Sequence, residues 1–333
     1  MGAKPIPPHM STIAKSLQRV LSGGESKIAI QIEDIEEPEL LKEVLSEPFY
    51  SKKGDEAIAN CLDTNKAARC IWEYYVSLFN GIGSVVLEET VDSTMDNAKR
   101  YLRDWASHKW VLVVAKTQLK GRGRYHRRWV SPPGGLWLTL GTRLGREQPD
   151  PVLTLIVGAY IAYALELLVA VPIQLKWPND IVLEGYKLGG ILVETTIEPH
   201  GENSVFIGVG INVNNKRDEL PEGAIALREV LGKSLKLPVV LCHVAWGIGR
   251  ALKDVVEENK ERAFRIWVRR DACNNKKIKI ATHEGVLEGV EKGITREGML
   301  RILTDSGEIE VDGDVLWCEG IKYKLQSMSD TRG

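Results

Sequence analysis

The stretch KWPNDIVLEGYKLGGILVE, residues 176–194, has the pattern of a short hairpin with apolar strands. The tripeptide PND at 178–180 is compatible with a plain turn. However, Lys176 and Lys187 flank the hairpin, and a lysine that is partly buried there needs an anionic partner. The glycine pair at 189–190 also removes side chains from a place where a ligand could lie. The stretch therefore predicts either a simple turn or a polar site beside a buried hairpin.

A basic cluster lies upstream in QLKGRGRYHRRW, residues 118–129, between two predicted strands. It holds four arginines and one lysine around Gly121 and Gly123, and these like charges repel one another unless an anion lies between them. The alternatives are a solvated charged loop, a nucleic-acid contact, or a phosphorylated ligand held by a mobile glycine loop. Guanidinium groups suit the phosphorylated ligand, because they make planar, bidentate contacts with phosphate or carboxylate.

Two further stretches carry weaker signals. VDSTMDNAK (91–99) places Ser93 and Thr94 at a helix start, where they either cap the helix or bind a polar ligand group. In GVGINVN (208–214), glycines at alternate positions of an apolar strand leave one sheet face bare, for a packed helix or for a ligand. Asn212 in this strand would need hydrogen-bond partners if it were buried.

Composition excludes several classes of protein. The chain has 333 residues, is 44% hydrophobic and 27% charged, and carries a formal net charge of −1. These values are typical of a soluble protein of two or three domains rather than of a dedicated nucleic-acid binder. No apolar run is long enough for a transmembrane helix, and the N-terminus lacks the pattern of a signal peptide. We therefore expect a cytoplasmic protein with no membrane partner.

Cysteine usage agrees with that compartment. The five cysteines are scattered and form no CxxC pair, at Cys61, Cys70, Cys242, Cys273 and Cys318. Their odd number and their spacing favour reduced thiols over a disulfide framework or a zinc site.

Three stretches of the chain differ in charge and in predicted secondary structure. Residues 1–83 hold nine Lys and Arg against twelve Asp and Glu, a net charge of −3, and 32–45 and 67–79 read as helical. Residues 84–270 alternate strand and helix patterns, several strands being close enough in sequence to be antiparallel neighbours, and end in two helices over 240–270. From 271 onward, short strands alternate with EG, KG, SG and DG turns. We expect an α+β fold with a mixed or antiparallel sheet covered by helices, followed by a small β-barrel.

Taken together and in this order, the motifs resemble those of the biotin protein ligases. The resemblance rests on AKTQLKGRGRYHRRW, KWPNDI, KLGGILVE and GVGINVN after an STxxxA helix start, and it covers roughly residues 84–325. The short GGLWLTL is most similar to archaeal members. The resemblance implies the class II synthetase-like biotin/lipoate ligase fold, with a catalytic domain over 84–270 and an SH3-like barrel over 271–333. Residues 1–83 are then an accessory region, mainly helical.

The resemblance also implies a reaction. These enzymes join biotin to ATP, giving biotinyl-5′-AMP and pyrophosphate, and then transfer biotin to a lysine of a biotin carboxyl carrier protein. Two anions must meet in the first step, so cations are needed where negative charge accumulates. Magnesium is the implied cofactor, and the resemblance leaves open whether the chain acts as a homodimer.

Matching motifs transfer roles to particular residues. The implied catalytic residues are Lys187, Arg122 and Asp180, with Asp180 also a candidate magnesium ligand. The implied biotin-binding residues are Ser93, Thr94, Gln118, Gly121, Arg122, Lys187 and Gly190. The implied nucleotide-binding residues are Arg122, Arg124, Trp129, Asn179, Lys187 and Asn212.

Other functions remain as alternatives. A lipoate– or octanoate–protein ligase shares the fold, but the RRxSGGG stretch usual in that family is absent. A biotin-sensing transcription regulator would need a basic N-terminal domain, whereas residues 1–83 are acidic, which argues against DNA binding. A non-catalytic paralogue would not be expected to keep the complete Lys, Arg and Asp set. One departure concerns His126, where many bacterial members have glycine.

Overall fold

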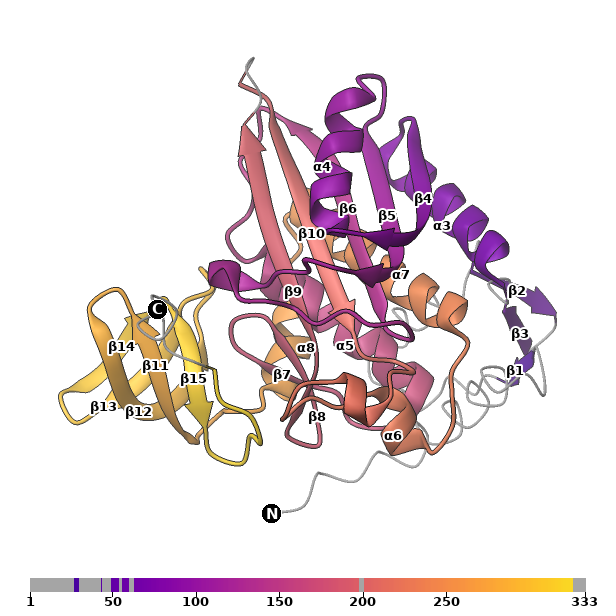
Figure 1. Ribbon diagram of the computed structural model, residues 1–333. Coiled ribbons are helices and arrows are strands. Elements are labelled where there is room, and N and C mark those ends of the chain that lie inside the picture. The colour runs from indigo at the N-terminus through magenta and orange to yellow at the C-terminus, as the bar shows by residue number, and fades with distance from the viewer. Residues whose placement is uncertain are drawn as a thin grey trace.

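The computed structural model describes residues 27–29, 43, 49–53, 56–59, 63–197 and 201–325 (Figure 1). Within these ranges a seven-stranded sheet forms the centre of the molecule. A three-stranded sheet comes before the central sheet in the sequence, near the N-terminus, and a five-stranded sheet comes after it, near the C-terminus. Figure 1 shows the five-stranded sheet beside the end of the central sheet that carries β7 and β8.

The central sheet has the strand order β4-β5-β6-β10-β9-β8-β7. Its strands are β4 (Gly83–Val91), β5 (Trp110–Gln118), β6 (Leu136–Gly145), β7 (Gln174–Lys176), β8 (Asp180–Leu183), β9 (Tyr186–Ile197) and β10 (Asn203–Ile211). The pair β4–β5 is parallel and the other neighbouring pairs of this sheet are antiparallel. The prediction of a mixed sheet in an α+β fold is confirmed.

The predicted hairpin at 176–194 is formed by β8 and β9. Its turn is Glu184-Gly185, and both residues have positive φ, 52° and 81°. A two-residue turn of this kind matches the right-handed twist of its flanking strands. In the resulting register Val182 pairs with Lys187, and Asp180 pairs with Gly190. The turn therefore places a carboxylate and an ammonium group on neighbouring strands.

Helices cover both faces of the central sheet. On one face lies α4 (Thr94–Asp104), whose Met95, Ala98 and Leu102 pack against β5 and β10. On the other face α5 (Leu153–Val169) is buried along nearly its whole length and packs against α7 (Leu237–Val256) and α8 (Glu261–Arg270), while α3 (Thr64–Phe79) packs against α7 and β4. The helices predicted within 67–79 and 240–270 correspond to α3, α7 and α8.

Shorter elements complete this part of the chain. They are the helix α6 (Leu227–Leu231) and the 3-10 turns η1 (Arg124–His126) and η2 (Arg217–Glu219). No helix in the described ranges combines the length and apolar character that a bilayer span requires.

The region before residue 83 contains strands that the sequence reading does not include. They are β1 (Lys27–Ala29), β2 (Tyr50–Lys53) and β3 (Glu56–Ala59), paired antiparallel in the order β1-β3-β2. The helix predicted at 32–45 lies outside the described residues except for Glu43, which is helical. Segments of three or four residues carry too little periodicity to be recognised from the sequence alone.

The C-terminal sheet fits the expected SH3-like domain. Its order is β14-β13-β12-β11-β15, and all its neighbouring pairs are antiparallel. The strands are β11 (Lys277–Thr282), β12 (Gly285–Ile294), β13 (Leu300–Thr304), β14 (Gly307–Val311) and β15 (Asp314–Cys318). The division of the chain at residues 83 and 270 stays a prediction.

The expectation that all cysteines are reduced is wrong for two of them. Cys273 and Cys318 form a disulfide, with their Cα atoms 6.1 Å apart. The reason is the pairing of β11 with β15, in which Ile278 lies opposite Cys318. A separation of 45 residues in the sequence cannot reveal that proximity. Cys70 and Cys242 are buried thiols, and Cys61 lies outside the described residues.

Candidate active site

A cavity of about 280 Å³ lies where β8, β9 and β10 meet the start of α4 and the loop that follows β5. This volume lies just below the usual range for small-molecule sites, about 300–1,000 Å³. All but one of the residues with a predicted site role line it, namely Ser93, Thr94, Gln118, Arg122, Arg124, Trp129, Asn179, Asp180, Lys187, Gly190 and Asn212. The fold therefore gathers motifs that are far apart in the sequence, while the role of each residue stays a prediction.

Gly121 is the exception. A Cβ atom at this position would lie 2.5 Å from the Trp129 carbonyl oxygen and 2.8 Å from Ser131 Oγ. The Trp129 amide donates a hydrogen bond to the Gly121 carbonyl at 2.8 Å. Gly121 thus allows the two sides of the basic loop to approach each other, and its place in the structure gives no support to the predicted contact with biotin.

One end of the cavity is built from uncharged groups, and we call Thr94, Gln118, Ser131 and Thr139 the neutral end. The amide and hydroxyl of Thr94 both donate to Gln118 Oε1, at 2.8 and 3.0 Å. Gln118 Nε2 donates to Ser131 Oγ at 2.9 Å, and the hydroxyls of Thr94 and Thr139 are also 2.9 Å apart. These bonds fix the orientation of the amide, so the neutral end is a rigid set of donors and acceptors.

Ser93 lies beside this group, at the N-cap position of α4. Its side chain nevertheless makes no hydrogen bond to the helix, and only 2% of the residue is exposed. The alternative that Ser93 serves simply as a helix cap therefore has no support from its side-chain geometry.

The opposite end is charged, and we call Asp180, Lys187, Lys176 and Tyr323 the ionic end. Lys187 Nζ lies 2.6 Å from Asp180 Oδ1, and the Tyr323 hydroxyl donates to Oδ2 at 2.8 Å. Burial opposes ionisation of Asp180, but the attraction of Lys187 and Lys176 and the bonds from Lys187 and Tyr323 outweigh it, so its pKa is lowered. A carboxylate with only 3% exposure therefore stays ionised.

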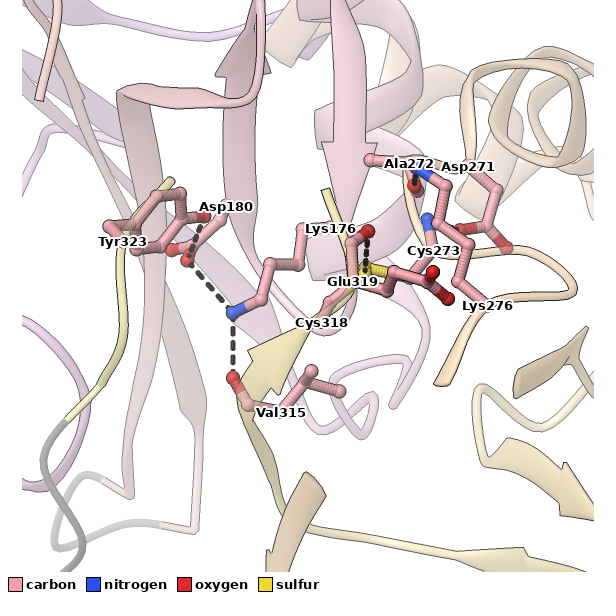
Figure 2. The surroundings of a disulfide bond; sticks show 10 residues. All are labelled: Lys176, Asp180, Asp271, Ala272, Cys273, Lys276, Val315, Cys318, Glu319 and Tyr323. Carbon is pink, nitrogen blue, oxygen red and sulfur yellow. Dashed lines mark hydrogen bonds and ion pairs between the residues drawn. A yellow bond between two sulfur atoms is a disulfide. The ribbon is translucent and has the colours of Figure 1, made fainter. Parts of the chain in front are cut away.

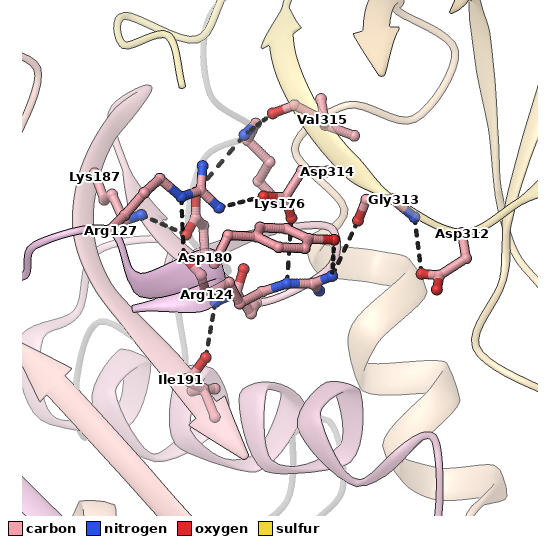
Figure 3. A network of polar contacts seen from close by, with 12 residues as sticks. Arg124, Arg127, Lys176, Asp180, Lys187, Ile191, Asp312, Gly313, Asp314 and Val315 are labelled. Carbon is pink, nitrogen blue, oxygen red and sulfur yellow. Dashed lines mark hydrogen bonds and ion pairs between the residues drawn. The ribbon is translucent and has the colours of Figure 1, made fainter. Parts of the chain in front are cut away.

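Lys176 approaches the same carboxylate from β7. Its Nζ lies 3.7 Å from Asp180 Oδ2 and donates to the Val315 carbonyl in β15 at 2.6 Å (Figure 3). Because the residue is buried, its pKa falls to about 8 despite the attraction of Asp180. The prediction that the lysines flanking the hairpin need an anionic partner is confirmed, and Asp180 is the partner of both.

The basic loop places Arg122 against two carboxylates. Its Nη1 and Nη2 lie 2.7 and 2.6 Å from the two oxygens of Asp96 in α4, and its Nε lies 3.4 Å from Glu194 in β9. The hydrogen bonds to Asp96 raise the pKa of Arg122, and the same bonds lower the pKa of Asp96. Arg122 is thus fixed as a cation at the edge of the cavity.

Arg124 and Arg127 connect the loop to the C-terminal sheet. Both guanidinium groups face Asp314 at the start of β15, with Arg124 Nε 3.3 Å from Oδ1 and Arg127 Nη2 paired with Oδ2 (Figure 3). Arg124 Nη2 also donates to the Gly313 carbonyl at 3.3 Å. Carboxylates of the protein therefore offset the mutual repulsion of the cluster and connect the loop to the C-terminal sheet.

The bare sheet face predicted from the glycine motifs accommodates Trp129. A Cβ at Gly210 would lie 2.6 Å from Trp129 Nε1, and one at Gly190 would lie 3.4 Å from its six-membered ring. Lys187 Nζ lies 5.3 Å from the centroid of the indole. A side chain at Gly210 would therefore displace this ring from its place beside Lys187.

Two asparagines fix the backbone around Lys187. Asn179 Nδ2 donates to the Ile191 carbonyl at 2.8 Å, and Asn212, which is 3% exposed, lies 3.5 Å from the Lys187 carbonyl through its Nδ2. The Asn212 amide also donates to the Leu188 carbonyl at 2.9 Å. The expectation that a buried Asn212 finds polar partners is confirmed.

Comparisons with known proteins agree with this geometry. Residues 87–214 match the model of the Biotin/lipoate A/B protein ligase family. The bifunctional ligase/repressor BirA of Escherichia coli (strain K12) is 31% identical over 230 residues, which are 67% of this chain and 70% of that protein. The chain belongs to the biotin protein ligase family. The bifunctional ligase/repressor BirA of Bacillus spizizenii is 30% identical over 229 residues, again 67% of this chain and 70% of that protein.

A solved ligase supports the same assignment. The structure of biotin protein ligase from Aquifex aeolicus in complex with biotin and ATP is 29% identical and has a TM-score of 0.60. It covers 69% of this chain and 97% of the Aquifex chain. The resemblance to archaeal biotin protein ligases in particular stays a prediction.

Sequence reasoning about this ligase missed six residues of the site: Ser131 and Thr139 of the neutral end, and Asp96, Glu194, Asp314 and Tyr323. Asp96 and Glu194 lie inside quoted motifs, and the need of Arg122 for an anion was a usable signal for both. Asp314 and Tyr323 are 187 and 143 residues away from Arg127 and Asp180, their respective partners, and no sequence pattern connects them. Only the folded arrangement brings the C-terminal part of the chain to the cavity.

The basic loop of this ligase also has an unusual backbone. Tyr125 and His126 both have positive φ, 53° and 57°, a region that glycine enters at lower cost. Ligases with glycine at the position of His126 would adopt this turn without that cost.

Proposed function

We propose that this chain activates biotin with ATP and transfers it to a lysine of a biotin carboxyl carrier protein. In the first step the biotin carboxylate attacks the α-phosphorus of ATP, the bond to the bridging oxygen breaks, and pyrophosphate leaves. In the second step the carrier lysine attacks the biotinyl carbonyl, loses a proton, and AMP leaves. The observation that supports this most is a single cavity with a neutral end and an ionic end.

The neutral end suits the uncharged part of biotin. We assign the ureido group to donors and acceptors contributed by Ser93, Thr94 and Gln118, with the backbone at Gly190 along the side chain of biotin. Gly121, predicted to bind biotin, is assigned instead to shaping the basic loop. Because the hydrogen bonds at this end already orient Gln118, little reorganisation is needed when the ligand binds.

The ionic end suits the reacting anions. Lys187 of the ionic end, held by Asp180, and Arg122 at the edge of the cavity, held by Asp96, are the cations that we assign to the biotin carboxylate and the α-phosphate. Cations that are already oriented stabilise the negative charge that develops when two anions meet. We propose that these cations turn partly from the protein carboxylates to the substrate as it binds.

Nucleotide contacts complete the proposal. We assign Arg124 to the phosphates and Trp129 to stacking on adenine, with Asn179 and Asn212 near the nucleotide. Arg124 and Arg127 of the basic loop bind Asp314 in β15, which supports a loop that is closed over the nucleotide. Closure would exclude water from the mixed anhydride, which hydrolyses readily.

Asp180 is the carboxylate predicted as a magnesium ligand. In the described part of the chain no three His, Cys, Asp or Glu side chains gather as a metal site. Mg²⁺ is usually held by one or two carboxylates together with substrate phosphates. Both oxygens of Asp180 are already engaged by Lys187 and Tyr323, and Lys176 lies 3.7 Å away, so Asp180 does not fit such an ion in this arrangement. Magnesium carried by the phosphates of ATP would neutralise their charge.

The experiment that tests the function uses the full chain with ATP, Mg²⁺ and labelled biotin. We expect biotinyl-5′-AMP and pyrophosphate, and then a labelled carrier domain when one is added. Octanoate and lipoate, offered in parallel, should give no adenylate. Adenylate from octanoate or lipoate but not from biotin would contradict the assignment and favour the lipoate–protein ligase alternative.

We further propose that residues 1–83 do not bind DNA, although the BirA relatives are named as repressors. Their net charge of −3 supports this, because phosphate contacts need clustered cations. A tight, salt-dependent complex with one specific duplex, lost on deletion of residues 1–83, would contradict it.

We also propose a cytoplasmic location. The Cys273–Cys318 disulfide counts against this location, because thiols are normally kept reduced in the cytoplasm, and it therefore makes the location testable. Thiol labelling of protein taken from fractionated cells would show where the chain resides and whether the bond is formed there. Sedimentation with and without ligands would show whether the chain forms a homodimer.

A further inference from the structure

The segment that follows β15, residues 319–325, returns to the active-site cavity. The Lys322 amide donates to the Gly185 carbonyl in the turn between β8 and β9, at 2.8 Å. The Leu325 amide donates to the Leu316 carbonyl at 2.9 Å, and Tyr323 and Leu325 line the cavity. The C-terminal part of the chain therefore completes one wall of the cavity.

Two glycines make room for this segment. A Cβ at Gly185 would lie 2.8 Å from the Gly320 carbonyl oxygen, and one at Gly223 would lie 2.5 Å from Tyr323 Cβ. Both glycines have positive φ, 81° and 78°. The close approach of these backbones fixes where the side chain of Tyr323 begins.

The disulfide fixes the start of the same segment. Cys318, the last residue of β15, is bonded to Cys273, which lies just after α8 (Figure 2). The Ile321 amide donates back to the Cys318 carbonyl at 3.1 Å. Figure 2 shows the disulfide close to Lys176, with Tyr323 and Asp180 on the other side of that lysine.

Tyr323 contacts the central carboxylate of the site. Its hydroxyl donates to Asp180 Oδ2 at 2.8 Å, and the residue is 8% exposed. Lys176 Nζ and Lys187 Nζ lie 5.0 and 5.7 Å from the centroid of its ring. Burial, and then the charge of Asp180, raise the pKa of Tyr323, so the phenol stays a neutral donor.

We propose that Tyr323 is a positioning residue, which holds Asp180 so that Asp180 can orient Lys187 for biotin activation. This inference rests on the proposed function and adds a residue from the C-terminal segment to the site.

The geometry explains why the hydroxyl matters. Asp180 shares its two oxygens between Lys187 on one side and Tyr323 on the other, while Lys176 stands 3.7 Å from the oxygen that Tyr323 contacts. Without the phenol, that oxygen is free to move toward Lys176. The carboxylate would then rotate, and Lys187 would lose its 2.6 Å contact.

The experiment compares Tyr323→Phe with the wild type in biotinyl-5′-AMP synthesis by the full chain. The variant keeps the ring and its packing and removes only the donor. A hydrogen bond to a charged group is worth roughly ten- to a hundred-fold in an equilibrium or a rate. We expect kcat to fall by about that range, with the KM for biotin nearly unchanged, because α4, β5 and β6 build the neutral end.

Tyr186→Phe is the matched control. The Tyr186 ring packs against the same segment, with Lys322 Nζ 4.1 Å from its centroid, and it lies outside the residues that line the cavity. We expect wild-type rates from this variant.

A double-mutant cycle separates positioning from general packing. If Tyr323 acts through Asp180, then Tyr323→Phe should cost little further activity in an Asp180→Asn background. The same loss in both backgrounds, or wild-type kcat in Tyr323→Phe, would overturn the proposal while leaving the ligase assignment intact. A wild type that makes no adenylate from biotin would instead overturn the proposed function, and this role with it.

Discussion

The two ends of the cavity are built in different ways. The neutral end uses Thr94, Gln118, Ser131 and Thr139, which belong to consecutive elements between the start of α4 and β6, and its bonds join uncharged groups. The ionic end joins Asp180 and Lys187 of one hairpin to Tyr323, which lies far along the chain. The basic loop beside the cavity is bound through Arg124 and Arg127 to Asp314 in the same C-terminal part.

This difference separates binding from chemistry. The neutral end is rigid and local, so it should contribute similarly to binding of substrate and of transition state. The ionic end is assembled from distant segments around a buried carboxylate, so it should govern the rate and depend on pH and on the C-terminal sheet. Variants at the two ends should therefore differ in which kinetic constant they change.

Lys187→Ala should reduce biotinyl-5′-AMP synthesis by roughly 100- to 1,000-fold, the cost of removing one preorganised group that stabilises developing charge. Pre-steady-state quenching would measure the rate, and circular dichroism would confirm that the fold is kept. Lys116→Ala is the control, because that lysine is exposed and pairs with Glu89 at the surface. Adenylate formed by Lys187→Ala at near the wild-type rate would refute the assignment of the ionic end.

Lys176 should give the stability of the protein a distinctive dependence on pH. Its pKa in the folded state is about 8, below its ordinary value, so between pH 8 and 10.5 the unfolded chain binds a proton that the folded chain lacks. The free energy of unfolding should therefore rise with pH across this window, by up to about 3 kcal/mol from this group. Lys176→Met should lack the rise.

Urea unfolding of the wild type and Lys176→Met at pH 7.5 and pH 10 measures the effect. Other titrating groups are common to both proteins, so the difference between the two free energies isolates Lys176. Parallel pH dependences would show that the lysine is not desolvated in the way described.

Thr94→Val should act on binding rather than on the rate. It removes the hydroxyl that bonds Gln118 and Thr139 and keeps a side chain of similar shape. A neutral hydrogen bond contributes about 1 kcal/mol, so the KM for biotin should rise about five- to ten-fold with kcat nearly constant. Thr90→Val is the control, because Thr90 is exposed in β4. A fall in kcat as large as that of Lys187→Ala would show that the neutral end governs the rate as well, which contradicts the proposed division between binding and chemistry.

His126→Gly should have the smallest effect. It relieves a positive φ of 57° in the folded loop and also increases the freedom of the unfolded chain, two terms of opposite sign. We expect the free energy of unfolding to change by less than about 1 kcal/mol. Thermal unfolding would measure it, and a large loss would show that the His126 side chain makes a contact essential to the loop.

The same contrast explains what could be read from the sequence. The hairpin at 176–194 and the helix start at Ser93 follow local sequence patterns, and their prediction succeeds because short-range contacts determine them. The strands of the central sheet also follow local periodicity, but the pairing of β6 with β10 joins segments far apart in the sequence and could not be read from it. The partner of the two hairpin lysines could be inferred, because a buried ammonium group requires an anion. In contrast, Asp314, Tyr323 and the disulfide depend on how the C-terminal sheet packs, which no local pattern encodes.

The direct test of the account is whether the C-terminal sheet holds the loop closed over the adenylate. Arg124→Gly and Asp314→Asn each break the contact between the loop and β15, from opposite sides. Wild-type protein and both variants would be loaded with labelled biotin and ATP and passed through a desalting column. Biotin on a bystander protein would then be measured at equal turnover. The account predicts that the wild type retains biotinyl-5′-AMP while both variants release it and label the bystander several-fold more. Retention by both variants equal to that of the wild type would contradict it.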